Sequence, residues 1–333
     1  MKANLQSLNQ TALKKKGSWT KLPMMNFVVS NSGILIALIS LIVFFALTTS
    51  TFMTPSNLLN VLRQISINAI IAFGMTFTIL ITGIDLSVGS VLAASQVITI
   101  GLLFMGVPII PALFGGILIG AVLGFINGFV ITKGKIPPFI VTLSMMIMAR
   151  GLSYVLTGGR PMSFNNDVLS FIGNGYIGPI PVPVIIMIIC LILTSFVLNK
   201  TRFGRHVYAV GGNREAARFS GIRISKIEMI VYTISGVLAG LSGVILAARM
   251  SSAQPTSGSG FELDAIAAVV LGGTSFSGGI GKIGGVFIGA LIIGVLNNGL
   301  NLLHVSSYWQ MIIKGLVIVT AVYVDSVKKK KST

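Results

Sequence analysis

The chain has 333 residues, of which 53% are apolar and only 9% are charged, and its mean hydropathy is +0.93. A soluble domain carries about 25% charged residues, so this composition excludes a soluble protein and predicts an all-α integral membrane protein. The net charge is +17, but the cations fall between apolar runs and at the chain ends. That placement argues against nucleic-acid binding and is typical of membrane loops.

The first apolar run, near residues 27–48, follows a lysine-containing segment, residues 1–26, and so resembles a signal peptide. It is long enough to cross a hydrocarbon core of about 30 Å, and no small-residue cleavage pattern is present. We interpret it as a retained membrane anchor. Cys190, the single cysteine, excludes an intramolecular disulfide and is expected to be a small core residue.

Ten apolar runs have roughly the length needed to cross a membrane. They lie near residues 27–48, 66–83, 86–106, 109–132, 139–157, 180–198, 228–249, 262–277, 283–303 and 308–325. Nineteen of the 24 cations fall in segments on one side of the membrane and only three on the other. The positive-inside rule then places both termini in the cytoplasm. The sequence predicts a cytoplasmic tail at residues 1–26, a transmembrane domain at 27–325 and a basic cytoplasmic tail at 326–333.

Three short patterns occur twice in the same order, which indicates an internal duplication. GIDL at 83–86 returns as GFEL at 260–263, GAVLGFING at 120–128 as GALIIGVLNNG at 289–299, and RGL at 150–152 as KGL at 314–316. The predicted crossings place the two copies, about 27–157 and 180–325, in opposite orientations. Two inverted five-helix repeats are a signature of alternating-access transport.

A polar segment with seven cations, Lys200 to Lys226, interrupts the apolar sequence and contains GGNREAARFSG at 211–221. Asn213 is a suitable helix N-cap, Glu215 falls in the first turn, and Gly221 is placed to end the helix. We expect a two-turn helix, in which small Ala216 and Ala217 allow a partner to approach and Phe219 offers an apolar contact. A solvated basic loop without a partner is the alternative.

EAARFSG, residues 215–221, resembles the EAA-x-x-x-G coupling motif of the membrane subunits of binding-protein-dependent ABC importers. ILITGIDLSVGS at 79–90, the run 248–279 and NNGLNLL at 297–303 resemble the sugar permeases of that family. The resemblance covers almost the whole chain from about residue 27. It implies that Asn213, Arg214, Glu215, Ala216, Ala217, Arg218, Phe219 and Gly221 form the helix that docks on the ATPase.

The resemblance also implies an inner-membrane permease homodimer that imports ribose or a similar sugar, with allose, xylose, galactoside and autoinducer-2 as alternatives. Its partners would be one ATPase with two nucleotide-binding domains and a periplasmic sugar-binding protein, with lipid around the dimer. The chain itself is expected to hold no cofactor and to hydrolyse no ATP. SFSGGIGKI at 275–283 lacks the first glycine and the final hydroxyl of a phosphate-binding loop.

Polar residues within the predicted crossings or at their ends are candidates for the sugar pathway or its gate: Asp85, Arg150, Glu262, Asp264, Asn297, Asn301 and Lys314. We hypothesise that Arg150 and Lys314 face the bundle interior and pair with the acids, the alternative being that they reach to the outer headgroups. Asn297 and Asn301 share a helical face and either guide the sugar or bridge helices.

Two other classes of protein are alternatives. An ion-coupled secondary transporter also uses inverted repeats, but it normally needs an acid in the middle of a membrane span, and the seven acids here fall at span ends or in loops. An intramembrane enzyme would need a catalytic arrangement. The sequence holds no metal-spaced His or Cys cluster and no paired carboxylates.

Overall fold

The computed structural model describes residues 32–330; residues 1–31 and 331–333, and with them the tail predicted at 1–26, lie outside the described part. The helices are α3 (Ser32–Thr48), α4 (Pro55–Leu80), α5 (Val88–Phe104), α6 (Ile109–Gly134), α7 (Pro138–Thr157), α8 (Asp167–Asn174), α9 (Val182–Lys200), α10 (Arg202–Gly212), α11 (Arg214–Phe219), α12 (Ile224–Met250), α13 (Phe261–Leu271), α14 (Ile283–Leu302) and α15 (Ser307–Lys330). Four two-residue strands are β1 (Met162–Ser163), β2 (Tyr176–Ile177), β3 (Ile180–Pro181) and β4 (Ser252–Ala253).

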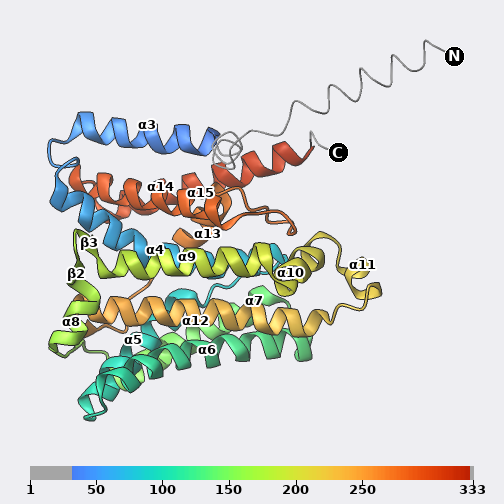
Figure 1. The fold of residues 1–333 in the computed structure, drawn as a ribbon, viewed down its shortest axis with the longest axis horizontal. Helices are drawn as coiled ribbons and strands as arrows, with labels where there is room; N and C mark the ends of the chain where they lie inside the picture. The colour runs from blue at the N-terminus through green and yellow to red at the C-terminus, as the bar shows by residue number, and fades with distance from the viewer. Residues whose placement is uncertain (1–31, 331–333) are drawn as a thin grey trace.

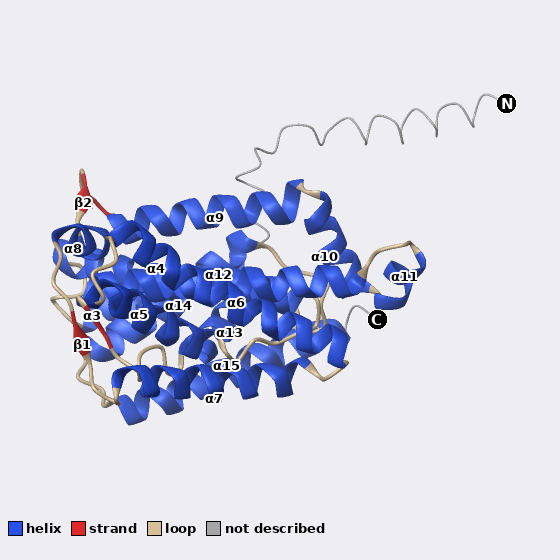
Figure 2. Ribbon diagram, turned by 90° about the horizontal axis from the view of Figure 1, so that it is seen from below, coloured by secondary structure: helices blue, strands red, loops and turns tan. Residues whose placement is uncertain are grey.

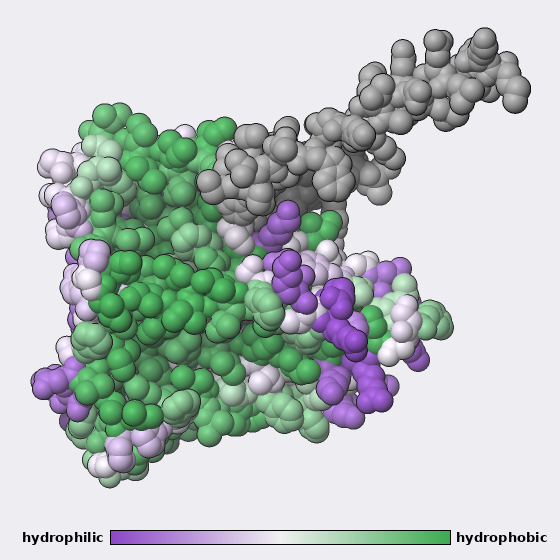
Figure 3. All heavy atoms as spheres, in the orientation of Figure 1, coloured by the Kyte–Doolittle hydropathy of each residue, from purple (hydrophilic) through white to green (hydrophobic). Residues whose placement is uncertain are grey.

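The long helices lie side by side and give the molecule two distinct ends (Figure 1). One end carries α8 and the antiparallel strand pairs β1–β4 and β2–β3 (Figure 2), and we call it the α8 end. The opposite end carries α10 and α11 and is called the α11 end. On the face seen in Figure 3, the surface between the ends is mostly hydrophobic, and hydrophilic residues gather at the two ends. This distribution fits a bundle with an apolar belt for lipid.

Each of the ten predicted runs corresponds to one helix, but their lengths differ. Among the described residues, six helices are long and apolar enough to cross a membrane: α4, α6, α7, α9, α12 and α14. The bounds predicted for the run at 262–277 are wrong at the C-terminal end. The helix α13 has 11 residues and ends at Leu271, because Gly272 caps it and Gly273, at a φ of +82°, turns the chain away.

The second predicted run, 66–83, was also misplaced, because α4 begins eleven residues earlier, at Pro55. Thr54 is the N-cap: its side chain accepts a hydrogen bond from the backbone N–H of Asn57, and proline occupies the first helical position. The basic tail predicted at 326–333 begins inside a helix, since α15 extends to Lys330.

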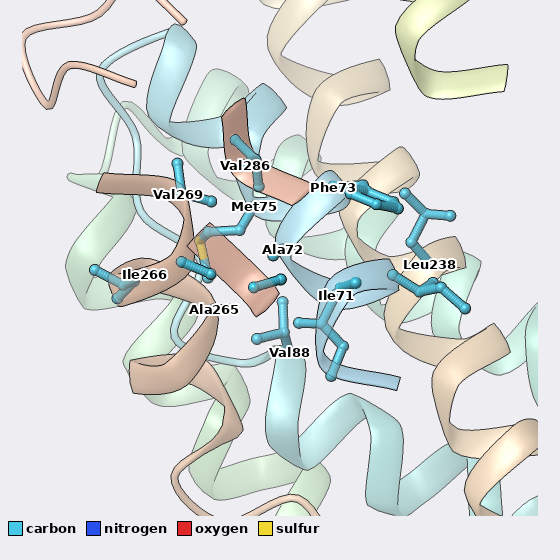
Figure 4. Close-up of a cluster of buried hydrophobic side chains, with 14 of the residues drawn as sticks. Ile71, Ala72, Phe73, Met75, Val88, Leu238, Ala265, Ile266, Val269 and Val286 are labelled. Atoms are coloured by element: carbon cyan, nitrogen blue, oxygen red, sulfur yellow. The ribbon is translucent and has the colours of Figure 1, made fainter. Parts of the chain in front are cut away.

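The interior of the bundle is built around α4, whose residues from Ile65 to Leu80 are all buried. Figure 4 shows Ala72 and Met75 of α4 beside Ala265 and Val269 of α13, with Val88 of α5 close by. A helix that is apolar on every side is expected where protein surrounds it.

Glycines bring α6 and α12 into close contact. A Cβ atom on Gly120 would overlap the backbone of Gly236 and Gly240, and one on Gly124 would overlap the backbone of Tyr232 and Gly236. Small residues at this spacing allow two backbones to approach where lipid supplies no hydrophobic drive between helices.

The helix contacts repeat between the two halves of the chain. The helix α5 packs on α6 and α7, and α13 packs on α14 and α15. Each of these groups also receives a helix from the other half, because α12 packs on α5 and α6 while α4 packs on α13 and α14. The two halves are therefore interleaved through α4 and α12, which also pack on each other.

Candidate functional site

The helix α11 stands at the end of the bundle, where the sequence predicted a docking helix. Asn213 is its N-cap and accepts a hydrogen bond from the backbone N–H of Ala216 at 2.9 Å, and Glu215 lies in the first turn. The helix is shorter than the predicted two turns, because it has six residues and ends at Phe219. Gly221 follows one residue later, with a φ of +80° that only glycine adopts easily.

The outer face of α11 is available to another molecule. Phe219 is 87% exposed, and Ala216 and Arg218 are also exposed, whereas Ala217 is buried. A phenylalanine exposed to this degree contributes nothing to the packing of this chain. An apolar residue beside small residues and cations has the composition of a protein contact.

One ion pair ties α11 to α12, between Arg214 and Glu228, which is only 7% exposed. The backbone N–H of Ile222, in the link between the two helices, donates to the carbonyl oxygen of Ala217 at 3.1 Å and closes the end of α11. Arg214 is 55% exposed, so the ion pair adds little stability. It does fix the position of α11 relative to α12.

The helix α10 ties α11 to two further parts of the bundle, and the sequence analysis missed it. Tyr208 donates a hydrogen bond to the carbonyl oxygen of Gly281 at 2.8 Å, and burial raises the pKa of Tyr208, so the hydroxyl stays a donor. Gly211 lies against the carbonyl oxygen of Leu80 and the N–H of Gly279, and that N–H donates to the same carbonyl at 2.9 Å. The end of α4, the end of α10 and the loop between α13 and α14 therefore meet.

Among the candidate pathway residues, Asp85 is buried in a polar cluster in which no cation of the described residues takes part. Its Oδ1 accepts hydrogen bonds from the backbone N–H and the hydroxyl of Ser87, and its Oδ2 accepts one from Ser235 of α12. Asn127 of α6 donates to the Ser87 hydroxyl at 2.9 Å. The predicted pairing of Asp85 with Arg150 or Lys314 is not formed.

Asp264, Asn297 and Lys314 do come together. The ammonium nitrogen of Lys314 lies 3.0 Å from Oδ1 of Asp264, and the amide of Asn297 donates to Oδ2 at 3.3 Å. Asp264 is 4% exposed and lies in the first turn of α13. Its contacts with Asn297 and Lys314 therefore join α14 and α15 to α13. Asn301 belongs elsewhere: it is exposed, and it accepts a hydrogen bond from Gln310.

Arg150 forms no salt bridge with any described acid, and its interaction with Glu262 is electrostatic at longer range. Its guanidinium donates to the carbonyl oxygens of Pro255 and Ser257, the second at 2.7 Å. Glu262, one of the three acids expected as partners, accepts a hydrogen bond from the backbone N–H of Gly260 at 3.1 Å. Both side chains thus hold the backbone between β4 and α13.

Comparison with known proteins identifies the family. The model of the branched-chain amino acid transport system permease component matches residues 57–322. The chain is 50% identical to the ribose import permease protein RbsC of Bacillus subtilis, over 92% of this chain and 94% of that protein. It is 51% identical to RbsC of Haemophilus influenzae over 87% and 91%, and 42% identical to the D-allose transport system permease protein AlsC of Escherichia coli over 86% and 89%.

No solved structure matches the chain. The family model covers most of the residues that form the bundle, and six of the described helices are long and apolar enough to cross a membrane. The protein is therefore a multi-pass membrane protein with a mostly helical fold, and it belongs to the family of transport-system permease components.

Proposed function

We propose that this chain is the membrane-spanning subunit of an ATP-driven importer that carries ribose. Ribose import permeases from two organisms are about 50% identical to it over most of both chains, and an allose permease is less similar. Allose, xylose, galactoside and autoinducer-2 remain the alternative substrates. The chain is a transport subunit, and ATP is hydrolysed by a separate polypeptide.

The observation that carries this proposal is the exposed α11. It presents Phe219 and the motif EAARFSG at one end of the bundle, and α10 and α12 connect it to the interior. In the proposed complex α11 docks on an ABC ATPase with two nucleotide-binding domains, and the eight residues from Asn213 to Phe219 and Gly221 form the docking helix. Because α11 is connected to both α10 and α12, a force applied at Phe219 would be transmitted to the bundle.

The proposed complex contains two copies of this permease, the ATPase and a periplasmic sugar-binding protein. It lies in the inner membrane with both chain termini and the α11 end in the cytoplasm, as the cation distribution favours. We further propose ten crossings in two inverted repeats, 27–157 and 180–325. The reciprocal packing of α12 on α5 and α6 and of α4 on α13 and α14 supports this arrangement.

A reconstituted transport assay tests the proposal. Proteoliposomes would hold this chain with its ABC ATPase and sugar-binding protein, and uptake of labelled ribose would be measured with ATP inside. Ribose uptake that requires ATP and the binding protein is the expected result. Uptake driven by a proton or sodium gradient without ATP would instead support an ion-coupled transporter, and uptake of allose in preference to ribose would reassign the substrate.

A further inference from the structure

The chain between β4 and α13 is not helical, although it lies deep in the bundle. A Cβ atom on Gly89, the second residue of α5, would overlap the carbonyl oxygen of Gly258, so these two glycines touch. Likewise, Gly243 of α12 touches Leu92 of α5. The helices α5 and α12 run in the same direction, and the last residue of each lies at the α8 end. The two contacts therefore give the position of Gly258 along the length of α12.

Gly89 lies three residues, or about 4.5 Å, nearer the α11 end than Leu92. Gly258 is therefore level with about Gly240, which is about 15 Å from the end of α12 at Met250 and about 24 Å from its start at Ile224. The segment Gln254–Ser259 thus reaches roughly the middle of a membrane whose core is about 30 Å thick.

This segment turns its backbone inward and its polar side chains outward. Arg150 holds the carbonyl oxygens of Pro255 and Ser257, and Pro255 and Gly258 are buried. Thr256 and Ser259 are exposed and Gln254 is half-buried. Within residues 32–330 these three side chains form no hydrogen bond with the protein.

Lipid does not fit this surface. Irregular backbone and unpaired polar side chains occur at membrane depth where protein covers them or where they line a water-filled path. Hydroxyl and amide groups are also the groups that hydrogen-bond a sugar hydroxyl. The region is rigid, because Arg150 holds it on one side and the Lys314–Asp264 ion pair holds α13 on the other.

We propose that Gln254, Thr256 and Ser259 form a contact site for the sugar near the middle of the membrane. The ligand is a monosaccharide, and its hydroxyl groups exchange hydrogen bonds with water for hydrogen bonds with these three side chains. The inference rests on the proposed import function. It adds a place within the permease where the sugar is bound briefly, in addition to the external binding protein.

The first test removes the hydroxyls. The double variant Thr256→Val, Ser259→Ala is compared with Thr132→Val, whose hydroxyl is bonded to Gly128 of its own helix α6. Loss of one or two hydrogen bonds is expected to lower ribose uptake per ATP hydrolysed about three- to tenfold. Stimulation of the ATPase by the sugar-loaded binding protein should stay unchanged, as should all properties of Thr132→Val.

Normal uptake by the double variant would overturn the sugar site while leaving the import function intact. Failure of the unsubstituted complex to take up ribose with ATP would overturn the import function and the sugar site with it.

The second test reports access to water. Ser259→Cys in a Cys190→Ala background is treated with a membrane-impermeant thiol reagent, and Leu193→Cys, at an exposed apolar position of α9, is the control. We expect labelling of the cysteine at 259 that slows when ribose is transported, and no labelling at 193. A disulfide between two copies through position 259, or no labelling at 259 in any nucleotide state, would overturn the site.

Discussion

Gly211 lies so close to the carbonyl oxygen of Leu80 that a side chain on residue 211 would overlap it. This contact joins the last turn of α10 to the last residue of α4, and the N–H of Gly279 completes the junction with its bond to Leu80. Only Asn213 separates α10 from α11. A movement of α11 therefore reaches the turn that carries Asp85 and the loop that follows α13.

Substitution of Gly211 is expected to uncouple ATP hydrolysis from transport. In Gly211→Ala the added methyl group must push α10 away from Leu80, so ribose uptake per ATP should fall by tenfold or more while the ATPase still binds. The measurement is uptake and ATP hydrolysis in the same proteoliposomes. Gly212→Ala is the matched control, because a Cβ atom there meets nothing within 4 Å. Equal coupling in both variants would contradict this role of the junction.

The Lys314–Asp264 ion pair is expected to stabilise the packing of α15 on α13. In Lys314→Met the buried carboxylate of Asp264 loses its cation, and the free energy of unfolding should fall by about 3 kcal/mol. The variant Asp264→Asn, Lys314→Met removes both charges and should recover part of that loss. Unfolding in mixed detergent micelles measures both values. A double variant less stable than Lys314→Met would show that the charges do not act as a pair.

Much of the fold could be predicted from sequence because its signals are local. Apolar runs locate ten helices, and Asn213 marks the start of α11, where it is indeed the N-cap. The ends of the helices were less accurate. Residues 272–277 read GGTSFS, so the run predicted to 277 overlooked the two glycines that end α13. The polar first turns of α4 concealed its start at Pro55.

The partners of the charged residues could not be predicted, because they depend on contacts between distant parts of the chain. Arg150 meets carbonyl oxygens more than 100 residues away, and no side-chain pattern indicates a backbone acceptor. The same holds for Gly211, whose contact with Leu80 becomes visible only when α10 is in place. Asp264 is one of the three acids expected as partners of the two cations, and it is the acid that pairs with Lys314.

The close approach of α6 and α12 is expected to depend on Gly120. A Cβ atom at this position would overlap Gly236 and Gly240, so Gly120→Ala should push the helices apart and lower the free energy of unfolding by about 1 to 3 kcal/mol. Gly101→Ala is the control, since it also lies within a helix but its Cβ would meet nothing within 4 Å. Its stability should be unchanged or slightly higher. Equal losses in the two variants would point to the helix backbone, not to the contact.

Docking of the ATPase is expected to depend on Phe219, whereas the stability of the permease is not expected to depend on it. Phe219 is 87% exposed, so Phe219→Ala should leave the thermal unfolding of the isolated permease unchanged. If Phe219 fills a pocket of the ATPase, its loss costs about 2 kcal/mol of binding free energy, which weakens the affinity about 30-fold. Titration of the purified ATPase onto permease in nanodiscs measures this change. Ile280→Ala is the control, because Ile280 is 62% exposed in the loop after α13 but outside α11. Equal affinities of the ATPase for both variants would remove Phe219 from the contact, and a loss for Ile280→Ala alone would move the contact to the loop.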